Sequence, residues 1–222
     1  MSTYVLMRIL ESVPRRYEFG IRILTLGRLD KAYDRLAGHI KPGQQVLDIG
    51  CGTGALTLRA ARRGAIVKGI DINGRMLEIA RQRVEMARLT EYVDLVEMGV
   101  AQLDGEEANH YDAVTGGLCL SELNEDELTY TLKEAARVLR RGGLLLIADE
   151  VEPKGIVKRL IHMVLRVPLA ALAYVVTQQT TRPVSNLPAK LIDAGLSIVS
   201  LRLDLLGNFG EIIAQKPVSE SS

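Results

Sequence analysis

The sequence has few of the residues that cross-links and zinc sites require. Its 222 residues include only two cysteines, Cys51 and Cys119, which are far apart and belong to no C-x-x-C pair. The three histidines, His39, His110 and His162, are scattered along the chain. We therefore expect neither a structural disulfide nor a preformed zinc site, and we predict no bound metal.

The chain also lacks an excess of charge of one sign. Its 28 Lys and Arg residues balance 27 Asp and Glu residues, so the formal net charge is +1. This gives no reason to expect a nucleic-acid partner attracted by bulk electrostatics. The N-terminus has no basic region, apolar run and small-residue cleavage site of the kind that mark a signal peptide. With 47% hydrophobic and 25% charged residues, the chain is typical of one globular domain. The cysteine usage and the lack of signal-peptide features predict a cytoplasmic location.

What the sequence does contain is a glycine-rich turn, D-I-G-C-G-T-G, at residues 48–54. It follows an apolar run and precedes a helix-like stretch at 55–63. Gly50, Gly52 and Gly54 can adopt a positive φ, and they remove Cβ atoms that would block a ligand's approach to the backbone. The following helix would present unpaired amides and its positive dipole end. The turn therefore predicts a site for an anion or a nucleotide-like ligand.

Two carboxylates narrow the choice of ligand. Asp48 precedes the first glycine by two residues, where its charge would repel a phosphate. Asp71 ends the next apolar run about twenty residues on, where an acid binds ribose hydroxyls in Rossmann-type sites. One carboxylate for a ribose and one near a cationic amine suit a nucleoside that carries an amino acid better than a pyrophosphate.

These residues resemble the first two motifs of class I S-adenosylmethionine-dependent methyltransferases, particularly the quinone-biosynthesis-like group. The matching segments are V-L-D-I-G-C-G-T-G at 46–54 and G-I-D-I-N at 69–73, and the resemblance covers nearly the whole chain. The opening segment 4–17 and the phrase L-C-L-S-E-L at 118–123 look most like the corrinoid protein-associated methyltransferases. The resemblance implies S-adenosylmethionine as cofactor and a small-molecule methyl acceptor. The narrower likeness implies a corrinoid protein as partner.

Alternating strand and helix patterns predict an α/β fold with a parallel, doubly wound, Rossmann-like sheet. The expected strands are 45–49, 66–70, 92–97, 112–115 and 143–149, with helices near 54–62, 73–88 and 125–139. Asn73 is the expected N-cap of the second of these helices, and Gly142-Gly143 the expected end of the third. Residues 2–40 read as two or three helices, in which Leu26, Leu29, Tyr33 and Leu36 would pack on the core.

The C-terminal part changes character. Residues 196–204 and 208–215 are strand-like, and too few residues separate them for a helix, so they should pair as an antiparallel hairpin. Seven strands ending in such a hairpin are the class I methyltransferase arrangement. We predict one domain over 1–222, with N-terminal helices (1–40), a cofactor-binding core (41–150), a helical cap (151–182), and a last helix and hairpin (183–217).

The cap is densely apolar between Pro153 and Gln179. Lys158, Arg159 and Arg166 interrupt it, so it does not satisfy the pattern of a transmembrane span. We expect two helices that cover the open edge of the active site. An amphipathic helix on a membrane surface is the alternative, and it is not favoured.

The resemblance assigns cofactor contacts to residues at the ends of four strands. Many relatives carry Gly-Asp-Ala after the third strand, and the aspartate binds the adenine amino group. Here the stretch is Gly99-Val100-Ala101, so the acid is missing, and Gln102 is a candidate polar contact. Cys51 is favoured as a small buried residue over a nucleophile. The predicted cofactor-binding residues are Asp48, Gly50, Cys51, Gly52, Gly54, Asp71, Ile72, Val100, Ala101 and Gly116.

The segment after the fourth strand supplies the acceptor candidates Cys119, Ser121 and Glu122. Their alternative role is to begin a surface helix, with Ser121 and Glu122 as capping residues. Tyr17 and Arg182, together with His162, are further candidates from the N-terminal helices and the cap, although a structural role is favoured for each. No residue is assigned as catalytic.

Because a sulfonium methyl group is already activated, the protein mostly has to align donor and acceptor in a dry pocket. The apolar cap favours a hydrophobic acceptor such as a quinone-like ring. Two other functions stay open. Gly50-x-Gly52-x-x-Ala55 also satisfies a loose dinucleotide fingerprint, so an NAD(P)-dependent oxidoreductase is one alternative, and a non-catalytic partner-binding module is the other.

Overall fold

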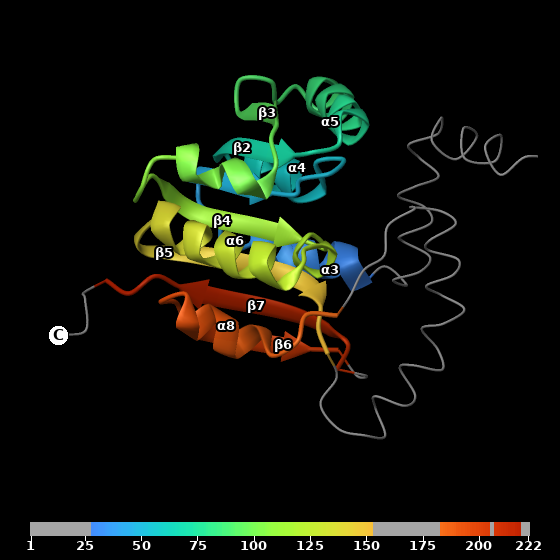
Figure 1. Ribbon diagram of the computed structural model, residues 1–222. Coiled ribbons are helices and arrows are strands. Elements are labelled where there is room, and N and C mark those ends of the chain that lie inside the picture. Colours follow the sequence, from blue (N-terminus) through green and yellow to red (C-terminus); the bar gives the residue numbers. More distant parts are fainter. Residues whose placement is uncertain (1–27, 153–182, 205–206, 219–222) are drawn as a thin grey trace, which may run out of the picture.

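The computed structural model describes residues 28–152, 183–204 and 207–218, and a seven-stranded sheet forms its centre (Figure 1). The strand order is β3-β2-β1-β4-β5-β7-β6. Strands β1 to β5 pair in parallel, and β7 pairs antiparallel with both β5 and β6. The strands are β1 (Gln45–Ile49), β2 (Ile66–Asp71), β3 (Val93–Glu97), β4 (Tyr111–Gly117), β5 (Leu139–Glu150), β6 (Ser197–Leu203) and β7 (Phe209–Gln215). This is the class I methyltransferase fold, so the predicted fold and its terminal hairpin are confirmed.

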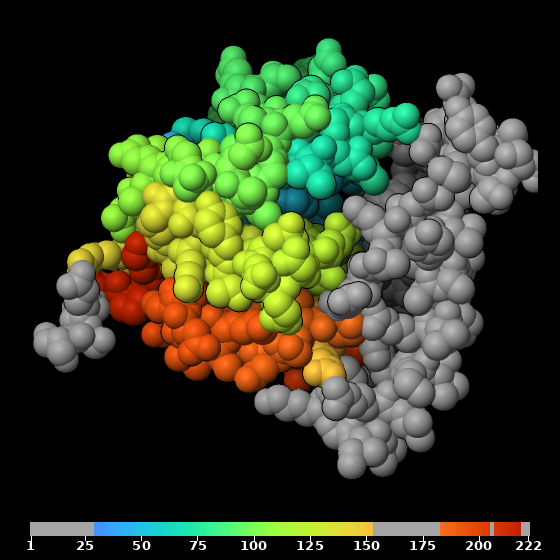
Figure 2. Space-filling model, viewed as in Figure 1, coloured from blue at the N-terminus to red at the C-terminus, as the bar shows by residue number. Residues whose placement is uncertain are grey.

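Helices cover both faces of the sheet. The α-helices are α3 (Arg28–Ala37), α4 (Ala55–Arg62), α5 (Gly74–Met86), α6 (Glu125–Val138) and α8 (Leu187–Asp193), and the 3-10 turns are η1 (Val100–Gly105) and η2 (Leu120–Glu122). Helices α6 and α8 lie on one face of the sheet, and Figure 2 shows their side chains covering much of that face. Helices α3 and α4 lie on the other face.

Two apolar cores hold these layers together. The larger packs α6 and α8 against the sheet through side chains such as Leu132 and Leu191, which are almost fully buried. The second lies under α3 and α4, where the predicted stripe of Leu29, Tyr33 and Leu36 is buried. Burying apolar surface on both faces is what a parallel sheet requires.

The end of α6 and the start of β5 differ from the prediction. The helix ends at Val138, and Leu139 already pairs with Tyr111, so Gly142 lies inside β5 with a φ of +77°. The register then shifts, and Ala113 pairs with Leu144. The glycine pair therefore forms an irregularity of the strand rather than the end of the helix, which is a known use of glycine in sheets.

Several expectations concern residues outside the described part. These are the helices predicted within residues 2–27, including Leu26, and the apolar cap, which falls largely in 153–182. Among the described residues, no helix is long and apolar enough to cross a membrane.

Candidate functional site: a glycine turn and a ring of carboxylates

The glycine turn joins the carboxyl end of β1 to α4. Gly50, Gly52 and Gly54 have φ angles of +62°, +53° and +79°, so all three occupy the left-handed region that L side chains avoid. The positive φ angles predicted for this turn are therefore present. The turn lies at the edge where parallel strands of an open α/β sheet present their carboxyl ends, which is where such sheets bind ligands.

The three glycines are needed for different reasons. A Cβ atom on Gly50 would lie 2.5 Å from Cβ of Cys119, and one on Gly54 would lie 3.3 Å from Cβ of Ala80. A Cβ atom on Gly52 would meet nothing within 4 Å. Packing inside the protein therefore excludes a side chain at Gly50, whereas Gly52 faces open space. Of the three, only Gly52 fits the predicted role of leaving the backbone open to a ligand.

Most N–H groups of the turn already donate hydrogen bonds within the protein. Cys51 N–H donates to the carbonyl of Ile70 at 2.9 Å, and Gly54 N–H donates to the carbonyl of Cys51 at 2.8 Å. Gly52 N–H donates to Oδ2 of Asp71 at 2.8 Å. A pyrophosphate would need such amides to be free, so their engagement argues against the dinucleotide alternative.

Asp71 links the glycine turn to the next helix. Its Oδ2 holds Gly52, and its Oδ1 accepts the N–H of Asn73 at 2.8 Å. Asn73 in turn caps α5, as predicted, by accepting from Arg75 and Met76. Each carboxylate oxygen can accept more than one hydrogen bond, so Asp71 retains acceptor capacity toward a ribose while its orientation is fixed.

Asp48 lies beneath the turn. Only 1% of its surface is exposed. Its oxygens accept hydroxyl hydrogen bonds from Thr57 and Thr115, both at 2.6 Å. Burial raises the pKa of Asp48 to about 6, although the two hydroxyls counter part of the rise. Because Asp48 is buried, its predicted influence on a nearby cationic amine would be electrostatic.

The predicted adenine end combines Ile72 with the start of η1. Ile72 is 74% exposed, and its Cγ2 would lie 3.1 Å from a Cβ atom on Gly99. Val100 is half-buried and packs on the larger core, whereas Ala101 is exposed. Gln102 accepts the N–H of Gly99 at 3.0 Å, so its side chain stabilises this turn. An exposed isoleucine beside bare glycine backbone is a suitable wall for a flat apolar ring.

Strand β4 continues to Gly117, two residues farther than predicted, so Gly116 is part of the strand. Cys119 lies between Gly116 and Gly50, and its Sγ would be 3.1 Å from a Cβ atom on Gly116. Burial raises the pKa of Cys119 well above its usual range, and that of Cys51 is raised for the same reason. Neither thiol is therefore suited to act as a nucleophile at neutral pH.

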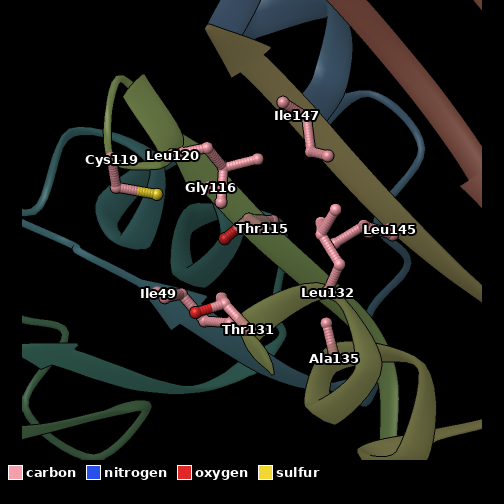
Figure 3. Close-up of a pocket in the computed structure, with 10 residues that line it drawn as sticks. All are labelled: Ile49, Thr115, Gly116, Cys119, Leu120, Thr131, Leu132, Ala135, Leu145 and Ile147. Atoms are coloured by element: carbon pink, nitrogen blue, oxygen red, sulfur yellow. The ribbon is translucent and has the colours of Figure 1, made fainter. Parts of the chain in front are cut away.

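Beneath Cys119 is a small internal cavity of about 10 Å³, roughly the room for one water molecule (Figure 3). Cys119 closes it at one end and Leu132 of α6 lines the other side. Gly116 borders this cavity and is buried. The cavity is too small to hold an acceptor.

Asp149, at the end of β5, anchors the segment after β4. It is fully buried and accepts the N–H groups of Leu120 at 2.7 Å, Ser121 at 3.4 Å and Glu150 at 2.7 Å. Burial raises its pKa to about 6. Ser121 is 1% exposed, and its hydroxyl lies near Asp149 but forms no hydrogen bond of ordinary geometry with the described residues.

Glu122 differs from its neighbours because it keeps access to solvent. Partial desolvation raises its pKa to about 7, and the negative charges of Asp149 and Asp71 add to the effect. The alternative that Ser121 and Glu122 cap the next helix is wrong, because Asn124 is the N-cap of α6 and Glu127 completes its capping box.

Two supports of the site were not predicted in these roles. Tyr33 of α3 lies directly over Gly117, where its hydroxyl oxygen would be 2.3 Å from a Cβ atom. Arg83 of α5 donates to the carbonyl and hydroxyl of Thr53 in the glycine turn, at 2.8 and 3.1 Å. The sequence carries no motif for either contact. The candidates Tyr17, His162 and Arg182 lie outside the described residues.

Residues 46–143 match a family model described as a methyltransferase domain. The structure also resembles that of a SAM-dependent methyltransferase from Methanosarcina mazei, with a TM-score of 0.65, 22% identity, and coverage of 82% of this chain and 96% of that one. At this identity the likeness shows the fold alone. Together with the family match, it defines the class: the chain contains a class I S-adenosylmethionine-dependent methyltransferase domain.

The relatives of this chain within the class include quinone methyltransferases. The demethylmenaquinone methyltransferase of Tropheryma whipplei (strain Twist) is 36% identical over 158 residues, which are 69% of this chain and 63% of the relative. The ubiquinone/menaquinone biosynthesis C-methyltransferase UbiE of Allorhizobium ampelinum is 32% identical over 148 residues, 64% of this chain and 56% of the relative. The chain thus spans about three fifths of the length of these relatives. The corrinoid-associated likeness finds no support among them.

S-adenosylmethionine is the methyl donor of this class, and the residues present fit it. Gly52 leaves an open approach to the turn, and Asp71 holds acceptor oxygens beside it. The carboxyl edge gathers Asp48, Asp71, Glu122 and Asp149, an anionic field that suits a ligand with a sulfonium and an ammonium group. Among the described residues, no group of His, Cys, Asp and Glu is arranged to hold a metal ion.

Proposed function

We propose that the whole protein transfers a methyl group from S-adenosylmethionine to a small hydrophobic acceptor with an ionisable proton, such as a quinol-like ring. The observation that carries this proposal is Glu122, an exposed carboxylate after β4 whose pKa is raised to about 7 by desolvation and by the nearby charges of Asp149 and Asp71. The quinone-related function of the relatives supports the same class of acceptor.

For the cofactor, Asp71 would accept the ribose hydroxyls while Gly52 N–H keeps its carboxylate oriented. Ile72 and the backbone at Val100 and Ala101 would flank the adenine ring. Asp48 would act from below the turn by its charge. When bound, S-adenosylmethionine supplies an activated methyl group, so the protein's remaining task is to position the acceptor and receive its proton.

Glu122 is the residue placed to receive that proton. A general base is most effective when its pKa lies near the working pH, and a carboxylate with a pKa of about 7 meets that condition. Asp149 fixes the segment by binding the N–H groups of Leu120 and Ser121, so it is a positioning residue. Because both thiols have raised pKa values, Cys119 is assigned to packing against Gly50 rather than to the chemistry.

The test is a methyl-transfer assay that follows S-adenosylhomocysteine release with a panel of acceptors. The panel contains a chemically reduced short-chain naphthoquinone, its oxidised form and a naphthalene without hydroxyl groups. The proposal predicts turnover with the reduced form alone, since only that form carries an ionisable hydroxyl. Turnover that is equal for all three, or absent with all of them although S-adenosylhomocysteine binds, would reject this acceptor class.

A further inference from the structure

A second recess lies beside α3, and it shares no lining residue with the glycine turn. It has a volume of about 310 Å³, which is within the range of small-ligand pockets. Its lining comes from α3 and from β6, β7 and their connection: Lys31, Arg35, Arg202, Leu203, Asp204, Phe209 and Glu211. Nothing in the proposed methyl transfer uses these residues.

Charge on α3 is divided between two sides of the helix. Its acidic residues, Asp30 and Asp34, both pair with Arg59 of α4, at 2.8 and 2.6 Å. Two of its basic residues, Lys31 and Arg35, lie one turn apart and line the recess instead. The helix therefore brings positive charge to the recess without its own acids beside it.

One carboxylate of the recess is already neutralised. Glu211 of β7 accepts both Nε and Nη2 of Arg35, a two-pronged pair that fixes the guanidinium. The Glu211 side chain is only 13% exposed, so this pair forms the floor of the recess. Arg202 lies opposite Glu211 in the β6–β7 register, and cross-strand partners project from the same face.

The second carboxylate is engaged in the backbone of the β6–β7 connection. Oδ1 of Asp204 accepts the N–H groups of Asn208 and Phe209, at 2.9 and 3.2 Å. By contrast, neither Lys31 nor Arg202 forms an ion pair or hydrogen bond with any residue of the described ranges. Two cations from separate elements thus face one recess whose acids have other partners.

We propose that this recess binds the phosphate or carboxylate group of a small organic anion, with Lys31 and Arg202 as the anion ligands. Arg35 would add a third positive group, held in place by Glu211. Phe209, the half-buried first residue of β7, offers a flat apolar surface for the body of the ligand. The ligand class is therefore a phosphate monoester or carboxylate carried on an apolar or aromatic group.

The experiment is a calorimetric titration of the full chain with phenyl phosphate, which has both features, and with phenol, which lacks the anion. We expect phenyl phosphate to bind and phenol to show no binding. Lys31→Gln and Arg202→Gln should each weaken phenyl phosphate binding by about threefold to tenfold, as expected for partly exposed ion pairs. Lys133→Gln on α6 and Arg62→Gln on α4 are matched exposed controls that should leave the dissociation constant within about twofold.

Two further measurements test whether the recess is independent of the glycine turn and where its anion comes from. S-adenosylhomocysteine affinity should be the same in the four variants, because none of the substituted residues belongs to the glycine turn or to the residues assigned to the cofactor. Co-sedimentation with phosphatidylglycerol vesicles, against phosphatidylcholine vesicles, tests a lipid headgroup as the source of the anion. The proposal is overturned if phenyl phosphate fails to bind at about 10 mM, if Lys31→Gln and Arg202→Gln leave its affinity unchanged, or if only the vesicles bind through these residues. None of these readouts depends on methyl transfer.

Discussion

The N–H of Gly52 donates to Oδ2 of Asp71 at 2.8 Å, which ties the most open residue of the glycine turn to the end of the neighbouring strand. The carboxylate is held on its other oxygen by Asn73 N–H. One side chain thus orients the turn, begins the next helix and retains acceptor capacity toward a ligand. A mutation of Asp71 should therefore affect both the cofactor and the turn.

Replacing Asp71 with Ala should weaken S-adenosylhomocysteine binding by about 1–3 kcal/mol, the usual range for hydrogen bonds to a charged group. Asp71→Asn should lose less, since one oxygen remains to hold Gly52. Calorimetric titration measures both, and Asp193→Ala at the end of α8 is a control far along the chain. An affinity equal to that of the wild type in Asp71→Ala would show that the ribose is held elsewhere.

The three glycine positions offer a graded test of the turn. Gly50→Ala should destabilise the fold by about 1–3 kcal/mol through the clash with Cys119, with about 1 kcal/mol more from the positive φ. Gly52→Ala should cost only about 1 kcal/mol of stability, because its Cβ would meet open space, but it should reduce cofactor affinity. Urea unfolding and S-adenosylhomocysteine titration separate the two effects.

Gly105→Ala is the matched control for this series, because Gly105 has neither a positive φ nor a neighbour within 4 Å of an added Cβ atom. Cys119→Gly should relieve part of the Gly50→Ala cost when the two are combined, since the clash is between their Cβ atoms. Strict additivity of the two single changes would contradict the contact as the cause.

The buried carboxylates predict an unusual pH dependence of stability. Asp149 has a folded pKa of about 6, raised by burial from 3.8. Between about pH 4 and pH 6 the native state therefore holds a proton that the unfolded chain has released, so the free energy of unfolding falls as pH rises. The shift corresponds to about 3 kcal/mol, lost by pH 7. Burial also raises the pKa of Asp48 to about 6, so Asp48 adds to the loss of stability with rising pH.

Asp149→Asn isolates this contribution, because it removes the titrating group and keeps the side-chain volume. Urea unfolding of the two proteins at several pH values between 4 and 7 gives two slopes. We expect the wild type to lose stability relative to Asp149→Asn across this range. Parallel curves would mean that Asp149 does not titrate in it.

Glu122→Gln should lower the rate of methyl transfer by about a hundredfold or more while leaving S-adenosylhomocysteine affinity unchanged. In the wild type the rate should rise with pH through about 7, as Glu122 loses its proton and becomes able to act as a base. The variant should lose this ascending limb. Glu125→Gln, at the start of α6, is the control, and an identical pH profile in Glu122→Gln would remove the residue from the mechanism.

Much of the fold was predictable because its signals are local. The strand and helix alternation, the short connection between the last two strands and the Asn73 cap each follow from a few neighbouring residues. The class of protein followed from the glycine turn and Asp71. The start of β5 was not predictable, because a glycine pair is equally compatible with the end of a helix and with an irregularity in a strand. The pairing of Leu139 with Tyr111, which the sequence does not reveal, decides between the two.

The contacts around the glycine turn were not predictable in detail. Asp48 precedes the turn in sequence, yet the threonine hydroxyls at Thr57 and Thr115 place its carboxylate underneath. The packing of Gly50 against Cys119, which leaves no room for a side chain at position 50, has no signal in the sequence. The anchoring role of Asp149 depends on contacts across 29 residues of sequence, for which no motif exists.

The most direct measurement is a side-by-side calorimetric titration of the full chain with S-adenosylhomocysteine and with NADH. We predict saturable binding of S-adenosylhomocysteine and an increase in melting temperature through its preference for the native state, with no binding of NADH. Binding of NADH with no effect of S-adenosylhomocysteine at about 1 mM would contradict the assignment of the glycine turn to S-adenosylmethionine.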